Sequence, residues 1–182
     1  MVTIVQEGNP VLRAQAERVE HFSDPELNTT IEAMANALFE QVDGIGIAAP
    51  QLGISKQIFL VTADVLDLDA LDKRLGANRH SPPKKRRVSP EEYLVCINPT
   101  FTKLSSKKSS DVEGCLSVRG QYGDVMRPEK VSITYFDEKG VSHSRGASGL
   151  LARVFQHEMD HLQGTLFIDR AKNIRTLDTH HE

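Results

Sequence analysis

The residues best suited to chemistry lie in one short segment, His157-Glu-Met-Asp-His161. Two histidines four positions apart lie on the same face of a helix, where both can bind one metal ion, and the glutamate between them can act as a general base. A helical wheel at about 100° per residue places both histidines and Glu158 on the aliphatic side, which predicts that they are buried. The same wheel places a polar group on the other side of the helix: Arg153, Gln156, Asp160 and Gln163.

Buried ionisable groups need partners, and either a metal ion or hydrogen bonds within the core would provide them. A metal held by two histidines needs a third protein ligand and leaves a position open for water. The metzincin pattern has a third histidine where this chain has Phe167, and little helix-forming sequence follows Asp169 to supply a later glutamate. Cys115, beside a glycine and suited as a thiolate to borderline metals, is the upstream candidate. Spacing alone does not establish that it reaches the helix.

Length and composition indicate one globular domain. The chain has 182 residues, 39% of them apolar and 26% charged, and a net charge of -3, which predicts no strong attraction to nucleic acid or acidic membranes. No apolar run approaches the roughly 20 residues that span a bilayer, and residues 1–13 contain no apolar signal core, so a cytoplasmic location is expected. In that compartment no disulfide is expected, and Cys96, in an apolar run, is expected to be a small buried hydrophobe.

Two helices and several short strands are predicted, and they do not alternate as βαβ units, so we expect an α+β fold. The first helix begins at a capping box, Ser23-Asp-Pro-Glu26, and its apolar residues recur at helical spacing as far as Val42. The second helix covers about 149–163 and stops at Gly164. Strands are expected at Gln57–Thr62, Tyr93–Asn98, Thr100–Leu104 and Lys130–Asp137.

We expect a single catalytic domain, 1–182, with two segments outside its framework. Residues 66–92 are predicted to be a polar surface insertion, and residues 170–182 a short, mostly polar tail. The insertion contains the basic run Lys84–Arg87, which is typical of a solvated loop or of a nuclear-localisation or nucleic-acid patch.

Three segments together resemble the signature motifs of the peptide deformylase family. They are Gly44-Ile-Gly-Ile-Ala-Ala-Pro-Gln51, Glu113-Gly-Cys-Leu-Ser117 and Gln156-His-Glu-Met-Asp-His-Leu-Gln-Gly164. The third alone occurs often by chance, but all three in this order are specific, and the resemblance runs from Asn9 to Asp169. It implies an enzyme that removes the N-formyl group from the starting methionine of nascent chains and releases formate. It also implies antiparallel or mixed strands packed around a central metal-binding helix.

The resemblance assigns roles to individual residues. The implied metal ligands are Cys115, His157 and His161. The usual physiological ion is Fe(II), and zinc, nickel or cobalt can substitute. Glu158 is expected to transfer the proton, while the Gln51 side chain and the Leu116 backbone N–H donate to the negative oxygen that forms. The substrate backbone and the methionine side chain are expected to contact Ile45, Gly46, Leu150 and Val154.

Two expectations concern residues next to this site. Glu113 and Arg127 are expected, by resemblance, to form an ion pair that positions Cys115; two independent surface charges are the alternative. In many relatives the position of Arg153 is aliphatic, which leaves the side-chain preference of the pocket open.

The implied partners are nascent formyl-methionyl peptides at the ribosome, with no stable nucleic-acid binding, no membrane, and a monomer or homodimer as the assembly. Three other functions stay open at this point: a zincin-type metallopeptidase, a non-catalytic metal or peptide binder, and a nucleic-acid binder using Lys84–Arg87. Phe167 weighs against the commonest zincin form, and the presence of Glu158 and Gln51 weighs against a non-catalytic binder.

Overall fold

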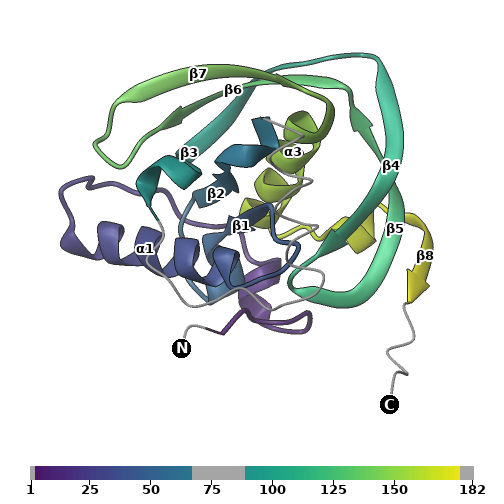
Figure 1. The fold of residues 1–182 in the computed structure, drawn as a ribbon, viewed down its shortest axis with the longest axis horizontal. Coiled ribbons are helices and arrows are strands. Elements are labelled where there is room, and N and C mark those ends of the chain that lie inside the picture. Colours follow the sequence, from purple (N-terminus) through teal and green to yellow (C-terminus); the bar gives the residue numbers. More distant parts are fainter. Residues whose placement is uncertain (1–2, 67–88, 177–182) are drawn as a thin grey trace.

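The strands form two antiparallel sheets in the computed structural model, which describes residues 3–66 and 89–176 (Figure 1). The larger sheet has the order β1-β2-β3-β6-β7, with β1 Gly46–Ala48, β2 Ile58–Thr62, β3 Tyr93–Leu104, β6 Lys130–Phe136 and β7 Ser142–Ser148. The smaller has the order β4-β5-β8, with β4 Lys108–Cys115, β5 Val118–Pro128 and β8 Lys172–Thr176. The α-helices are α1 Pro25–Phe39 and α3 Gly149–Leu162. The short 3-10 helices are η1 Pro10–Arg13, η2 Ala49–Leu52, η3 Ala63–Leu66, η4 Pro90–Glu92 and η5 Phe167–Asp169. This is the single α+β domain that the sequence predicts.

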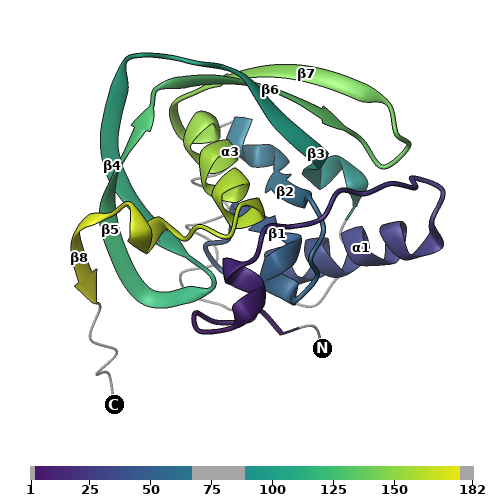
Figure 2. The ribbon, with the colours of Figure 1, turned by 180° about the vertical axis from the view of Figure 1, so that it is seen from behind.

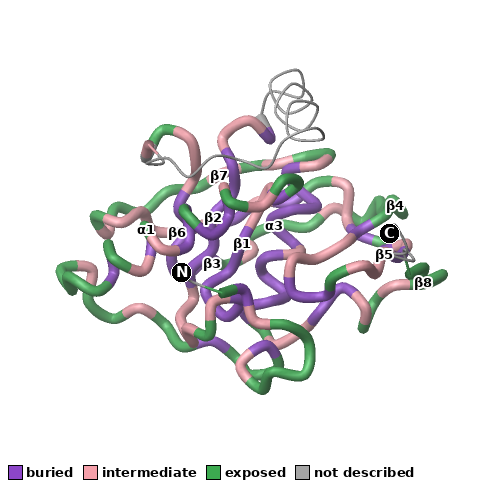
Figure 3. Tube along the Cα trace, turned by 60° about the horizontal axis from the view of Figure 1, so that its bottom comes forward, coloured by how far each residue is buried: buried purple, intermediate pink, exposed green. Residues whose placement is uncertain are grey.

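The larger sheet is buried on both faces along β2 and the first half of β3, because each α-helix covers one face there, whereas β7 is largely exposed. Along β2 the side chains alternate, as strand geometry requires. Phe59 and Val61 pack in the cluster that contains α3, whereas Ile58 and Leu60 pack in the cluster that contains α1. Figure 3 shows the resulting band of buried residues through β1, β2, β3 and α3.

Helix α3 lies between the larger sheet and the β4–β5 hairpin, and two opposite views show it enclosed by strands (Figures 1 and 2). The polar side of the predicted wheel is therefore mostly buried as well: Arg153, Gln156 and Asp160 are 6–8% exposed, and of these four polar residues only Gln163 faces solvent. The three buried side chains make hydrogen bonds with the hairpin. Gln156 Nε2, for example, donates to the Pro128 carbonyl at 3.0 Å. Burial of a polar helix side is stable when its hydrogen bonds are made.

Helix α1 differs from its prediction at both ends. Its N-cap is Asp24, not Ser23, and the Asp24 carboxylate accepts from the backbone N–H of Glu26 at 2.9 Å. Aspartate is as good an N-cap as serine, and Pro25 in the next position fixes a helical φ. The helix ends at Phe39, so Val42 lies beyond it and is 36% exposed.

The strand predictions are confirmed, with one merger. β2, β3 and β6 occupy the expected segments, and β3 continues through Thr100–Leu104 as one strand. Asn98 has a positive φ of 50°, and the register with β6 shifts beside it, so a bulge joins the two predicted strands. Gly164 has φ +71°, as expected of the residue that ends α3.

The predicted polar tail, 170–182, contains a strand that the sequence analysis did not predict. Residues 172–176 form β8, which pairs antiparallel with β5. All five residues of β8 are exposed, so no apolar alternation marks this strand in the sequence. Residues 177–182 lie outside the described residues, as do 67–88 of the predicted insertion with its basic run. Among the helices of the described residues, none is long and apolar enough to cross a membrane.

Candidate active site

Three potential metal ligands meet where β4 ends against α3. Cys115 is the last residue of β4, and His157 and His161 lie one turn apart on α3. One ligand atom from each of the three residues lies within 4.8 Å of the other two. The Cys115 Sγ is 3.3 Å from His161 Nε2. The structure thus brings together three side chains, and the two that are farthest apart in the sequence, Cys115 and His161, are separated by 46 positions.

The donor atoms and their spacing fit a divalent metal ion. With metal–sulfur and metal–nitrogen bonds of about 2.3 and 2.0 Å, tetrahedral ligands lie about 3.3–3.6 Å apart. The observed sulfur–nitrogen distance is in this range. His157 Nδ1 is 3.0 Å from Glu113 Oε2, which leaves Nε2 as its free donor, the usual arrangement of a ligand histidine. A thiolate with two imidazoles suits zinc, nickel, cobalt and Fe(II).

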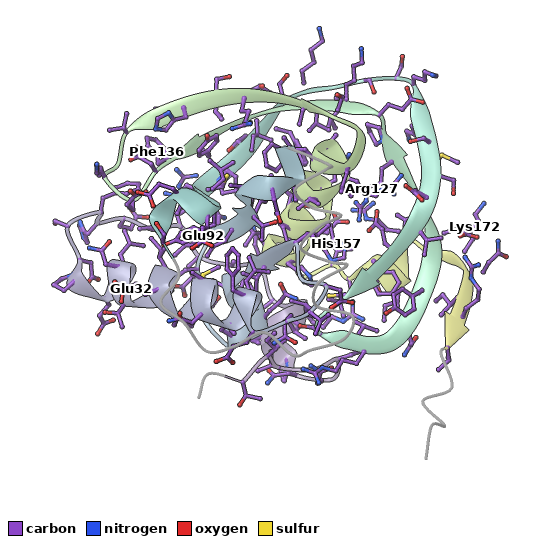
Figure 4. The ribbon with its side chains drawn as sticks, in the orientation of Figure 1. Glu32, Glu92, Arg127, Phe136, His157 and Lys172 are labelled. Carbon is purple, nitrogen blue, oxygen red and sulfur yellow. The ribbon has the colours of Figure 1, made fainter. Side chains whose placement is uncertain are left out.

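A buried ion network lies behind His157. Arg127 donates to both carboxylate oxygens of Glu113, at 2.7 and 2.8 Å, and to Asp160 at 2.8 Å. The predicted ion pair is confirmed. Burial alone would raise the pKa of Glu113, but hydrogen bonds from Arg127 and His157 hold that pKa well below its usual range. Figure 4 shows Arg127 and His157 in the space between α3 and the β4–β5 hairpin.

The two histidines have opposite electrostatic surroundings. Burial alone would lower the pKa of His157, but hydrogen bonds with Cys115 and Glu113 raise it well above its ordinary value. Burial, followed by the charges of His157 and Arg127, lowers the pKa of His161 well below its ordinary value. Metals bind the neutral imidazole, which the surroundings of His161 already favour, whereas metal binding at His157 would release the proton on its Nε2.

Glu158 faces the same space from the β1 side of α3. It is 3% exposed, and its Oε2 has no hydrogen-bond partner among the described residues. Burial raises the pKa of Glu158 to about 7. A carboxyl group with such a pKa can both take and give a proton near neutral pH. Its Oε1 lies so close to β1 that a Cβ added at Gly46 would be 2.5 Å away.

The Gln51 amide is held in a fixed orientation beside the cysteine. Its Oε1 accepts from the Ala48 backbone N–H at 2.8 Å, and its Nε2 donates to Ser117 Oγ at 3.2 Å. The same Nε2 lies 3.6 Å from Cys115 Sγ. Because the Ala48 contact fixes which end is oxygen, the N–H groups face the metal-ligand side.

Residues 5–7 of the N-terminal segment form hydrogen bonds with both loops of the site, one at Gln51 and the other at Leu116 and Ser117. The N–H of Val5 donates to the Gln51 carbonyl, and the N–H of Glu7 donates to the Ser117 carbonyl. Gln6 Nε2 donates to the Leu116 carbonyl at 3.1 Å. These bonds hold the carbonyl groups of Leu116 and Ser117 next to the segment that contains Gln51.

A cavity of about 480 Å³ opens at these residues. Its wall includes all of the residues predicted to bind substrate: Ile45, Gly46, Leu150 and Val154. Gln51, Cys115, Leu116, His157 and Glu158 also line it. β1 is the edge strand of the larger sheet, with no strand of the described residues paired on its other side. An extended peptide could add there by backbone hydrogen bonds.

Comparison with known proteins identifies the family. The family profile described as Polypeptide deformylase matches residues 1–176. The chain belongs to the peptide deformylase family. It is 42% identical over 170 residues to a peptide deformylase of Microchaete diplosiphon, and the match covers 93% of this chain and 79% of that protein.

Solved peptide deformylases share the fold. The chain is 40% identical to the enzyme of Synechococcus elongatus solved in complex with actinonin, with a TM-score of 0.76 and coverage of 94% and 81% of the two chains. The Plasmodium falciparum enzyme is 36% identical, with a TM-score of 0.76 and coverage of 94% and 87%. As a member of this family, the protein is a metal-dependent hydrolase that removes the N-formyl group from newly synthesised peptides.

Sequence reasoning from the deformylase motifs missed several contacts of this site. It did not predict that Ser117 Oγ accepts a hydrogen bond from Gln51, or that Arg127 and Arg170 donate to Asp160. It also left Arg153 without a partner, although the structure places its guanidinium against Glu113 at 2.7 Å. One available signal was that the charges of a helix predicted to be central must be paired, because isolated buried charges are unstable.

Proposed function

We propose that deformylation in this protein is carried by Glu158, Gln51 and the backbone N–H of Leu116, next to a metal held by Cys115, His157 and His161. The observation that carries this proposal is the buried Glu158 carboxylate, whose Oε2 has no partner among the described residues and which lines the same cavity as two of the three ligands. A divalent ion in such a site polarises a carbonyl group and lowers the pKa of water.

Glu158 moves the proton in this scheme. A water molecule attacks the formyl carbon, and Glu158 takes the proton that the water loses. The formyl C–N bond then breaks, Glu158 delivers the proton to the departing amine, and the products are formate and a free N-terminus. The proximity of Glu158 to β1 holds the carboxylate in place for both transfers.

Gln51 and Leu116 stabilise the negative charge that grows on the formyl oxygen. Of the two N–H bonds on Gln51 Nε2, one is engaged by Ser117 Oγ and the other has only the sulfur at 3.6 Å. The second N–H is therefore available to the formyl oxygen while the amide keeps its orientation. The Leu116 N–H follows Cys115 in a turn in which the Ser117 N–H donates to Cys115 Sγ at 3.4 Å.

The substrate backbone pairs with the free edge of β1 at Gly46, and the first side chain of the substrate packs against Ile45, Leu150 and Val154. This mode uses backbone bonds for affinity and one pocket for selectivity. It requires a free edge and an apolar wall beside the reacting group, and the cavity offers both.

The test is formate release from formyl-Met-Ala, with and without a chelator. We expect release that stops when the metal is removed and returns when it is added back. Acetyl-Met-Ala is the matched control and should not react. Cleavage of an internal bond in an unformylated peptide would favour a zincin-type peptidase, and binding without turnover would favour a non-catalytic binder; either result would contradict the proposal.

We propose Fe(II) as the ion used in the cell. A site with one thiolate and two histidines accepts several ions, and the affinity order favours nickel and zinc, so cellular supply would have to select iron. Fe(II) beside a thiolate is sensitive to oxygen, as is Cys115 itself. Protein purified without oxygen should contain iron and be most active. Equal activity of a zinc form purified in air would contradict the assignment.

We further propose that the protein acts in the cytoplasm, on nascent chains at the ribosome, as a monomer or homodimer without stable nucleic-acid binding. Its overall charge of -3 gives no long-range attraction to RNA. Co-sedimentation with translating ribosomes, compared with empty ones, tests this placement. Sedimentation equilibrium would determine the assembly.

A further inference from the structure

Arg153 is a buried charged residue in the cavity wall, next to the aliphatic residues predicted to contact the first side chain of the substrate. It lines the 480 Å³ cavity together with Leu150 and Val154, which precede and follow it on α3. Only 8% of the residue is exposed. A buried guanidinium is not needed to fill a hydrophobic wall, and aliphatic side chains would do so at lower desolvation cost.

The protein fixes this guanidinium but does not use all of its donors. Nη1 donates to Glu113 Oε1 at 2.7 Å and to the Val125 carbonyl at 2.9 Å, and Nη2 donates to the Ser109 carbonyl at 3.1 Å. Nε is 3.9 Å from Asp111 Oδ2, beyond hydrogen-bond range. An arginine has five N–H groups, so two of them make no hydrogen bond within the described part of the chain, and one of these two, on Nε, forms a long ion pair with Asp111.

The position of Arg153 along α3 matches the reach of a methionine side chain. Arg153 lies one turn before His157, and one turn of helix rises about 5.4 Å. A side chain that starts at the reacting group beside His157 and runs along α3 therefore ends beside Arg153, against Leu150 and Val154. The thioether sulfur is the one weak acceptor that a methionine side chain offers there.

We propose that Arg153 is a specificity-determining residue, whose free N–H groups favour a first side chain with an acceptor atom near its end over a hydrocarbon of the same length. The inference rests on the proposed function and names the feature by which that site selects methionine. Norleucine has the shape of methionine with a methylene in place of the sulfur. A purely apolar pocket would bind it at least as well as methionine, because a methylene is the more hydrophobic group.

The test compares kcat/KM for formyl-Met-Ala and formyl-norleucine-Ala. The wild-type protein should prefer methionine by about three- to tenfold, the value of one modest hydrogen bond. In Arg153→Leu the preference should fall to about one or reverse. Because the contact is made in both the bound and the transition state, the change in preference should lie in the ratio of the KM values for the two peptides, whereas loss of the contact with Glu113 changes kcat for both peptides alike.

A matched control separates this role from a structural one. Arg170 belongs to the same ion network through Asp160, but it does not line the cavity. Arg170→Leu should leave the methionine preference unchanged even where it lowers stability. A purely structural role for Arg153 would lower kcat and metal content in Arg153→Leu and leave the ratio between the two peptides as it was; that result would overturn the proposal.

The wild-type measurement keeps the proposal falsifiable if Arg153→Leu does not fold. Equal kcat/KM for the two peptides in the wild-type protein would overturn the assignment of Arg153 alone. Release of formate from neither peptide would instead overturn the proposed function, and the inference with it.

Discussion

At the scale of single residues, the site depends on how Glu158 is surrounded. Its neighbours on α3 include two histidines, and β1 lies so close on the other side that a Cβ at position 46 would be 2.5 Å from Glu158 Oε1. This enclosure removes water from the carboxylate and raises its pKa to about 7. A glutamate on an exposed helix would stay fully ionised there and would be a weaker base.

Replacement of Glu158 by glutamine tests this role. Glu158→Gln keeps the size and one hydrogen-bonding end of the side chain but cannot accept the proton, so kcat for formyl-Met-Ala should fall by about 10²–10⁴-fold. Metal content, measured by elemental analysis, should stay at the wild-type level because the three ligands are unchanged. A metal-replete variant with near-native turnover would show that Glu158 is not the base.

Residue types and spacing identified Cys115, His157, His161 and Glu158 as candidates, and the structure brings these side chains together. The i, i+4 histidines, the intervening glutamate and the glycine-flanked cysteine each have a chemical reason that is visible in the sequence. Partners such as Ser117 and Arg153 were not predictable in this way, because their contacts lie with Gln51 and with Glu113, 66 and 40 positions away. Their roles depend on which strands pass beside α3.

At the scale of elements, the approach of β1 to α3 determines whether the site can form. A Cβ at Gly46 would be 2.5 Å from Glu158 Oε1 and 3.0 Å from Val154 Cγ1. Gly46→Ala must therefore separate the strand from the helix or displace the carboxylate. Since displacements of about 1 Å can lower rates by about 10²-fold, we expect kcat/KM to fall at least tenfold.

Gly146→Ala is the matched control for this prediction. Gly146 lies in β7, where the nearest atom to an added Cβ is Ser132 Oγ at 3.9 Å. Activity and thermal stability of this variant should be close to wild type. Wild-type activity in Gly46→Ala would mean that the β1–α3 contact is looser than the structure shows.

The ion network joins α3 to the β4–β5 hairpin, and Arg127 is its centre. Arg127→Met would remove donors from Glu113 and Asp160, both of which are buried. Loss of one partner of a buried pair costs about 3–5 kcal/mol, and the lower end is expected because Arg153 and Arg170 still contact the two carboxylates. Urea unfolding would measure the change.

A surface pair provides the comparison for Arg127. Lys107 and Glu129 lie 3.1 Å apart, with the lysine side chain 79% exposed. Lys107→Met should change the free energy of unfolding by less than about 1 kcal/mol. If Arg127→Met were equally mild, the buried network would not be what holds α3 against the hairpin.

At the scale of the whole molecule, the candidate metal centre lies where the two sheets meet. Cys115 comes from the smaller sheet, the histidines come from the helix that packs on the larger one, and the N-terminal segment bonds to both loops. The α+β class followed from the order of predicted elements, but the pairing of β8 with β5 did not. An exposed polar strand at a sheet edge leaves no periodic signal, and its register depends on a distant partner.

This arrangement predicts that metal removal weakens the whole fold and not the site alone. A ligand that binds only the folded state at 100 to 1,000 times its Kd stabilises by about 2.7–4.1 kcal/mol, and for a domain of this size each kcal/mol shifts Tm by about 2–4 °C. Chelation should therefore lower Tm by about 5–15 °C. In Cys115→Ser, which lacks the thiolate that joins the smaller sheet to the site, the same chelator should change Tm by much less. The measurement is thermal unfolding of both proteins with and without chelator, with metal content assayed in each sample. An unchanged Tm in wild-type protein that has lost its metal would show that the two sheets are held together without it.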